Sequence, residues 1–215
     1  MNLEQRATIF RERLEPLAAR YGAFEVARLY LLGISSDKSQ RSMRSAMNAK
    51  CRPPGAKARK GVTYSDALAI QLLHFLDHAG YQLKKMVFDG KGHLVTIPDT
   101  VEGELPAKVE TGTDVEARVT IFASELPRLA DRYGAFEVAR WFLLGREESS
   151  AKQSMRSAMN AKCRPPGSKA RKGVTYADAL AIQLLVFLDR NGYDLGGMRF
   201  DGQGWLLDIQ KRPIG

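Results

Sequence analysis

The sequence predicts a mainly α-helical fold of the α+β class, with two homologous modules in tandem, each carrying one small β-hairpin. Residues 42–52 and 154–164 read the same, Ser-Met-Arg-Ser-Ala-Met-Asn-Ala-Lys-Cys-Arg. The motif Tyr-Gly-Ala-Phe-Glu-Val-Ala-Arg at 21–28 recurs at 133–140, an offset of 133 − 21 = 112 residues. Because a constant offset is typical of an internal repeat, we expect a tandem duplication that forms a pseudo-dimer within one chain.

The repeat divides the 215 residues into two modules, 1–97 and 115–215, joined by residues 98–114. The joining segment is rich in Pro, Gly, Thr and acidic residues and has no helical period, which predicts an acidic, flexible linker. Such a linker allows the modules to separate or to lie side by side.

Helical periodicity predicts the first elements of each module. A helix over 3–14 has its apolar residues on one face, and Pro16 is expected to break or restart it. A second helix over 23–32 should stop at Gly33, and a third is expected over roughly 37–50.

The second part of each module combines a core helix with a hairpin. Thr63 and Asp66 form a capping-box pattern that opens a helix over 64–79, whose apolar residues cover most of its circumference. Alternating residues around Asp-Gly turns predict strands at 85–88 and 93–97, and at 198–200 and 205–209. Because a lone hairpin is marginally stable, we expect it to lie on its own module's helices or to pair with the other hairpin.

Positive charge is concentrated in two tracts. Residues 41–60, the first basic tract, contain seven Lys or Arg and no acid, and so do residues 152–172, the second basic tract. The net charge of the chain is +9, so the remaining residues sum to 9 − 14 = −5. Focused positive charge attracts polyanions, which favours nucleic acid as the partner.

The helix of each tract has a polar side suited to base contacts. Arg can form two hydrogen bonds with guanine, and Asn can do so with adenine, in the DNA major groove. The loop that follows supplies cations among Pro, Gly and Ala, whose small size lets the backbone approach phosphates. The predicted nucleic-acid-binding residues of the first module are Arg41, Arg44, Ser45, Asn48, Lys50, Arg52, Lys57, Arg59 and Lys60. Those of the second are Lys152, Gln153, Arg156, Ser157, Asn160, Lys162, Arg164, Lys169, Arg171 and Lys172.

Other functional classes are less well supported. No catalytic residues, metal ligands or cofactors are predicted, because the three histidines have no histidine counterpart in the second module and no metal-ligand spacing occurs. Cations around Cys51 and Cys163 would favour their thiolates, but a nucleophile would still need a base. Residues 17–28 resemble part of a helix-turn-helix, yet Arg28 stands where an apolar anchor belongs, so two packed core helices are the plainer interpretation.

The sequence therefore predicts a non-enzymatic nucleic-acid-binding protein with a regulatory or accessory role, and duplex DNA is favoured over RNA. RNA binding, an adaptor for acidic protein partners, or a merely solvated basic surface are the alternatives. The absence of an apolar run of membrane-spanning length, of a secretory signal and of a disulfide framework predicts a cytoplasmic protein with no membrane partner. Further oligomerisation and the placement of Trp141 and Trp205 stay open at this level.

Overall fold

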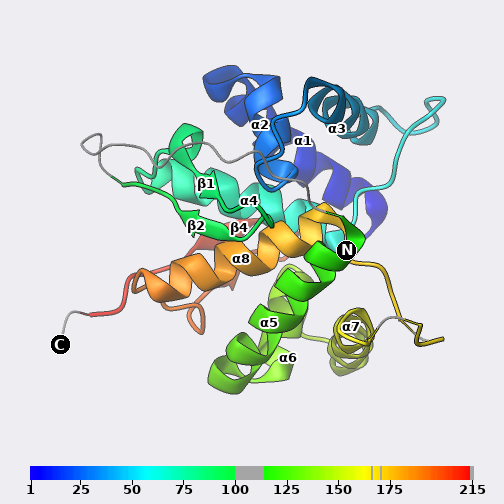
Figure 1. Ribbon diagram of the computed structural model, residues 1–215. Helices are drawn as coiled ribbons and strands as arrows, with labels where there is room; N and C mark the ends of the chain where they lie inside the picture. Colours follow the sequence, from blue (N-terminus) through cyan, green and yellow to red (C-terminus); the bar gives the residue numbers. More distant parts are fainter. Residues whose placement is uncertain (100–113, 166, 170, 214–215) are drawn as a thin grey trace.

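The computed structural model describes residues 1–99, 114–165, 167–169 and 171–213 (Figure 1). These residues form eight α-helices, one short 3-10 helix and two antiparallel strand pairs, which confirms a mainly helical α+β protein. Within them, no helix combines the length and apolarity needed to cross a bilayer. The predicted linker, 98–114, falls almost wholly outside the described residues.

Apart from the 3-10 helix of the first half, the elements of the two halves correspond in order and length. Residues 1–99, the first half, contain α1 (Leu3–Tyr21), α2 (Ala23–Tyr30), α3 (Asp37–Lys50), α4 (Tyr64–His78), the 3-10 helix η1 (Leu83–Lys85), β1 (Val87–Phe88) and β2 (Leu94–Thr96). Residues 114–213, the second half, contain α5 (Val115–Tyr133), α6 (Ala135–Phe142), α7 (Ser149–Lys162), α8 (Tyr176–Arg190), β3 (Arg199–Phe200) and β4 (Leu206–Asp208).

The predicted break at Pro16 is wrong. Helix α1 continues without interruption to Tyr21 with Pro16 inside it. Pro16 lies on the exposed side of the helix, where the carbonyl that it leaves without an amide partner can be hydrated. Leu14 and Leu17, on either side of it, are buried, so packing of the apolar face offsets the lost hydrogen bond.

The two halves share one core. Helices α4 and α8 pack against each other at the centre, and α1 and α5 cover them (Figure 1). Buried residues of both halves form a single hydrophobic cluster. Phe75 meets Tyr193 edge to face at 5.6 Å between ring centroids, and Tyr81 meets Phe187 in the same way at 5.3 Å. Of the two arrangements that the linker allows, the halves therefore adopt the side-by-side one.

Each hairpin is bound to the central helix of the other half. The Gln71 side chain of α4 donates to the Gly204 carbonyl at 3.2 Å and accepts from the Leu206 amide at 2.6 Å. Gln183 of α8 makes the equivalent two bonds to the β1–β2 hairpin, at 3.2 and 2.5 Å. The strand orders β1–β2 and β3–β4 show two separate pairs, so the expected alternative of hairpin-to-hairpin pairing is wrong.

The β1–β2 hairpin also contacts helix α2 and the turn after it in its own half. Phe88 packs on Gly33, where an added Cβ would lie 3.0 Å from the Phe88 side chain. Arg28 is buried, pairs with Glu25 at 2.6 Å and donates to the Met86 carbonyl beside the hairpin. This structural role of Arg28 fits the interpretation of α1 and α2 as packed core helices.

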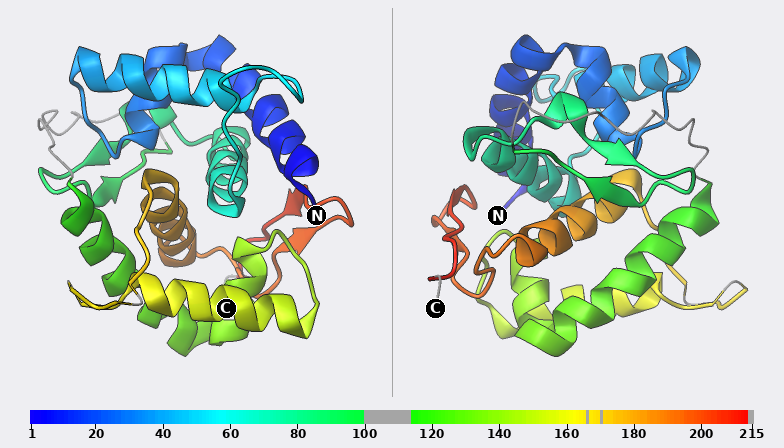
Figure 2. Two further views of the ribbon diagram at one scale, coloured as in Figure 1. Left: turned by 90° about the vertical axis from the view of Figure 1, so that its right-hand side faces the viewer. Right: turned by 60° about the vertical axis from the view of Figure 1, so that its left-hand side comes forward.

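Helices α3 and α7 lie on the same side of the molecule. Figure 1 shows both near its right-hand edge, with the loop that follows each helix extending outward. In the left view of Figure 2 the two helices cross the near face in opposite directions, one above and one below the central helices. The two basic tracts are therefore presented together, in an approximately two-fold arrangement.

Candidate nucleic-acid interface

Helix α3 separates an anchoring side from a solvent-facing side. Met47 and Ala49 are buried against the body of the protein, where α3 packs on α2. Arg44, Ser45 and Asn48 are exposed, as predicted from their spacing. Helix α7 repeats the pattern: its buried residues are Met159 and Ala161, and its solvent-facing polar residues are Gln153, Arg156, Ser157 and Asn160.

The loop after each helix is tied back to the helix end. The Lys60 amide donates to the Ala49 carbonyl at 3.0 Å, and the Lys172 amide makes the same bond in the second half at 3.0 Å. Within the first loop, the Arg52 side chain donates to the Lys57 carbonyl at 2.7 Å. These bonds restrict the loop, so its cations project from a defined backbone.

Lys50 is engaged inside the protein. Its ammonium pairs with Asp66, whose carboxylate also accepts from the Thr63 amide at 2.9 Å and hydroxyl at 2.8 Å in a capping box. Lys162 pairs with Asp178 in the same way. Both ion pairs join the C-terminus of one helix to the N-terminus of the next, and the predicted phosphate contacts of Lys50 and Lys162 stay a prediction.

Arg59 is likewise held by a carboxylate. Its guanidinium forms two bonds with Glu4, at 2.5 and 2.7 Å, and this pairing lowers the pKa of the Glu4 carboxyl. Arg171 and Glu116 form the equivalent pair at 2.9 and 2.8 Å. These two pairs hold the loops against α1 and α5, and the predicted phosphate contacts of Arg59 and Arg171 stay a prediction.

Two further cations of the tracts have weaker acidic partners. Arg41 lies 3.9 Å from Asp37, and both side chains are largely exposed. Lys152 pairs with Glu147 at 2.9 Å. The exposed Arg41–Asp37 pair contributes little free energy, so it leaves Arg41 available for another anion, whereas the Lys152 side chain is only 21% exposed.

Eight cations of the tracts have no ion pair with a carboxylate in the part of the chain that the structure describes. They are Arg44, Arg52, Lys57, Lys60, Arg156, Arg164, Lys169 and Lys172. Four lie in each half at equivalent positions, and all but the half-buried Arg156 are exposed. Intramolecular acids thus neutralise part of each predicted patch and leave a smaller cationic surface on α3, α7 and their loops.

An aromatic ring that the sequence pattern did not predict lies at the surface beside each of these helices. The Arg44 guanidinium lies 4.7 Å from the centre of the Phe24 ring, and Arg156 lies 5.2 Å from Phe136. The two rings are 39% and 44% exposed. Phe24 is one of the apolar residues of the helix predicted over 23–32, but it lies in the first turn of α2 and is partly exposed.

The two cysteines lie partly buried at the C-terminal ends of α3 and α7. Cys51 and Cys163 are free thiols, and burial raises the pKa of both. The expectation that neighbouring cations favour the thiolates is therefore wrong, because desolvation outweighs their attraction. In the described residues, no group of three His, Cys, Asp or Glu side chains is placed to hold a metal ion.

The two tryptophans have different surroundings. Trp141 is fully buried in the second half and donates to Glu137 at 2.9 Å, so it is a core residue. Trp205 is half-buried and its ring lies 5.0 Å from the Arg13 guanidinium carbon, across the contact between the halves.

Comparisons with known proteins give no relative. No protein-family model matches the chain, and no curated protein or solved structure matches it either.

Proposed function

We propose that the protein binds double-stranded DNA as a tandem duplication in which α3, α7 and their loops act as two equivalent contact surfaces. The observation that supports this most directly is the presentation of two exposed polar helix surfaces, identical over 11 residues, on one side of the molecule. Each carries four cations without an intramolecular carboxylate partner in the described residues.

The two parts of each surface have different tasks in this proposal. The loop lysines, Lys57 and Lys60 in the first half, contact phosphates and supply affinity without sequence preference. Arg44 and Asn48, one helical turn apart, reach base edges in the major groove and supply sequence preference. Their equivalents in the second half do the same.

The arrangement of α3 and α7 favours inverted half-sites. The helices run in opposite directions across one face, as the two recognition helices of a symmetric dimer do (Figure 2). The shared core holds them at a constant separation, so both halves can engage without further ordering. Joining two surfaces in this way can raise avidity by roughly 10²–10⁴ over one surface.

A mobility-shift titration tests the proposal directly. Duplex DNA, single-stranded DNA and RNA are compared at about 50 mM and about 200 mM salt. Duplex DNA is expected to bind most tightly, and Lys57→Ala with Lys60→Ala should lower the salt slope by about 2. Preference for RNA, whose narrow major groove excludes a helix, would contradict the duplex-DNA assignment.

A charge-matched control variant distinguishes the effect of these two loop lysines on binding from the effect of the net charge. Lys84→Ala with Lys91→Ala removes two exposed lysines of the same half that lie outside the basic tract. This control should bind as the wild type does. Equal losses in the two double variants, or binding only to acidic polypeptides, would overturn the proposal.

A further inference from the structure

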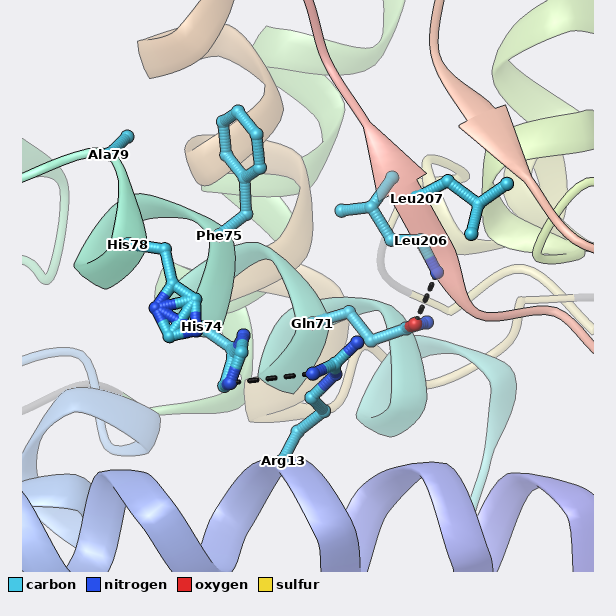
Figure 3. A pocket seen from close by; sticks show the side chains of 8 residues that line it. All are labelled: Arg13, Gln71, His74, Phe75, His78, Ala79, Leu206 and Leu207. Carbon is cyan, nitrogen blue, oxygen red and sulfur yellow. Dashed lines mark hydrogen bonds between the residues drawn. The ribbon is translucent and has the colours of Figure 1, made fainter.

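A groove opens between the two halves, away from the basic loops. Helix α1, the C-terminal part of α4 and strand β4 form it, and Figure 3 shows Arg13, His74, Phe75, Leu206 and Leu207 along its walls. Its volume is about 360 Å³, within the range of small-molecule sites. The C-terminal end of α4 lies on the opposite side of the molecule from the loops after α3 and α7 (Figure 1).

Arg13 brings a cation into this groove without a carboxylate to neutralise it. Its guanidinium faces the Trp205 ring, and Nη1 lies 3.4 Å from His74 Nε2. In the described residues Arg13 has no ion pair within 4.0 Å, although Glu12 acts on it at longer range. Burial lowers the pKa of Arg13, so this charge is partly desolvated and a bound anion would compensate it.

The other walls of the groove match an anion with an apolar body. Burial, with smaller effects of Arg13 and His78, lowers the pKa of His74 to about 4, so near neutral pH its imidazole is an uncharged hydrogen-bonding group. Gln71 is already bonded to the hairpin, whereas Phe75, Leu206 and Leu207 offer an apolar wall. One permanent positive charge beside an apolar wall suits a monoanion better than a phosphate dianion.

The equivalent groove at α5 and α8 has no uncompensated cation at the position of Arg13. Positions 112 residues later carry Glu125 for Arg13, Val186 for His74 and Arg190 for His78. Glu125 and Arg190 lie 3.8 Å apart and neutralise each other, in a groove of about 280 Å³. The two grooves have the same frame, so the difference between them lies in these side chains.

We propose that the groove between α1, α4 and β4 binds one small organic monocarboxylate, with the carboxylate on Arg13 and the apolar body against Phe75, Leu206 and Leu207. The planar guanidinium can hold a carboxylate with two parallel hydrogen bonds. This site is separate from the DNA-binding surface and does not depend on that proposal.

Titration of the whole protein with benzoate, followed by the indole N–H resonance of Trp205, tests the site. Saturable binding of one benzoate per chain is expected, with benzamide and inorganic phosphate each binding at least about tenfold more weakly. Arg13→Gln should weaken benzoate binding by about 10- to 100-fold, and Arg13→Lys should retain part of the affinity.

Arg190→Gln, in the equivalent groove, is the matched control and should leave benzoate binding unchanged. Unfolding in urea establishes that Arg13→Gln is folded, and Leu207→Ala, at an exposed residue, provides a second variant with an expected loss of about threefold. Wild-type affinity in Arg13→Gln, equal binding of benzamide, tighter binding of phosphate, or no saturation would each overturn the proposal.

Discussion

The two halves agree closely on the basic surface and differ at the junction between them. Helices α3 and α7 share an identical run of 11 residues, and the pairs Lys50–Asp66 and Lys162–Asp178 are equivalent. At the junction, the positions equivalent to Arg13 and His74 carry different residues in the second half, Glu125 and Val186. The same backbone arrangement therefore carries equivalent outer surfaces on α3 and α7 and different side-chain contacts between the halves. The contacts differ because each depends on the side chains present at its own positions.

The largest expected effect concerns the buried carboxylates. Asp66→Ala removes the partner of Lys50 and the capping-box carboxylate that accepts from Thr63, and should lower the free energy of unfolding by about 3–5 kcal/mol. Asp178→Ala should cost about 1 kcal/mol more, because Asp178 also accepts from the Ser65 hydroxyl at 2.5 Å. Urea denaturation measures both, and a Ser65→Ala background should remove the difference. Equal costs for the two aspartates in the wild-type background would contradict this asymmetry.

The next largest effect concerns Gln71 and Gln183, and it tests whether the two hairpins contribute equally to stability. Gln71→Leu leaves the buried Leu206 amide without its side-chain acceptor, and Gln183→Leu does the same to the opposite hairpin. Each should destabilise the protein by about 2–3 kcal/mol, since a backbone amide that is buried at Leu206 and partly buried at Leu94 loses its partner. Similar shifts of the urea midpoint are expected, and a loss for only one variant would show that a single hairpin stabilises the junction.

The pH dependence of stability should distinguish the groove that contains His74 from the equivalent groove, which carries Val186. The pKa of His74 is lowered to about 4 by burial, with Arg13 and His78 opposing protonation and Asp77 favouring it. The unfolded state therefore binds more protons below pH 6.5, and stability should fall by about 2 kcal/mol as the pH drops from 6.5 to 4. His74→Val introduces the residue of the second half and should remove this component in urea titrations at several pH values. An unchanged pH profile in that variant would exclude His74 as its source.

The smallest effect concerns the exposed end of α3. Arg41→Gln introduces the residue found at the equivalent position of α7 and breaks the 3.9 Å pair with Asp37. Stability should change by less than about 0.5 kcal/mol, because exposed ion pairs contribute little. Thermal unfolding provides the measurement, and a loss above about 1 kcal/mol would show that this pair differs from an ordinary surface contact.

Local patterns predicted several elements well. The helix expected over roughly 37–50 is α3, Asp37–Lys50, and the capping box of Thr63 and Asp66 opens α4 at Tyr64. The strands form within the predicted segments but are shorter. Helix caps, periodicity and turn residues act between neighbours, so these features can be predicted without knowledge of the rest of the chain.

The partners of the tract cations could not be predicted in this way. Glu4 and Arg59 are 55 residues apart, and neither position shows a pattern that links it to the other. Phe24 is 39% exposed in the folded protein, which its apolar character does not indicate. The DNA-binding residues remain a prediction. Among the described residues, eight of their cations have no ion pair with a carboxylate.

The sequence by itself determined the repeated motif, the polar side of α3 and the concentration of charge, because these depend on residue order and local spacing. Only the tertiary structure decided that each hairpin binds the opposite central helix, that α3 and α7 run antiparallel on one side, and which cations are neutralised. Those features arise from contacts between distant segments, which form only when the shared core brings the segments together.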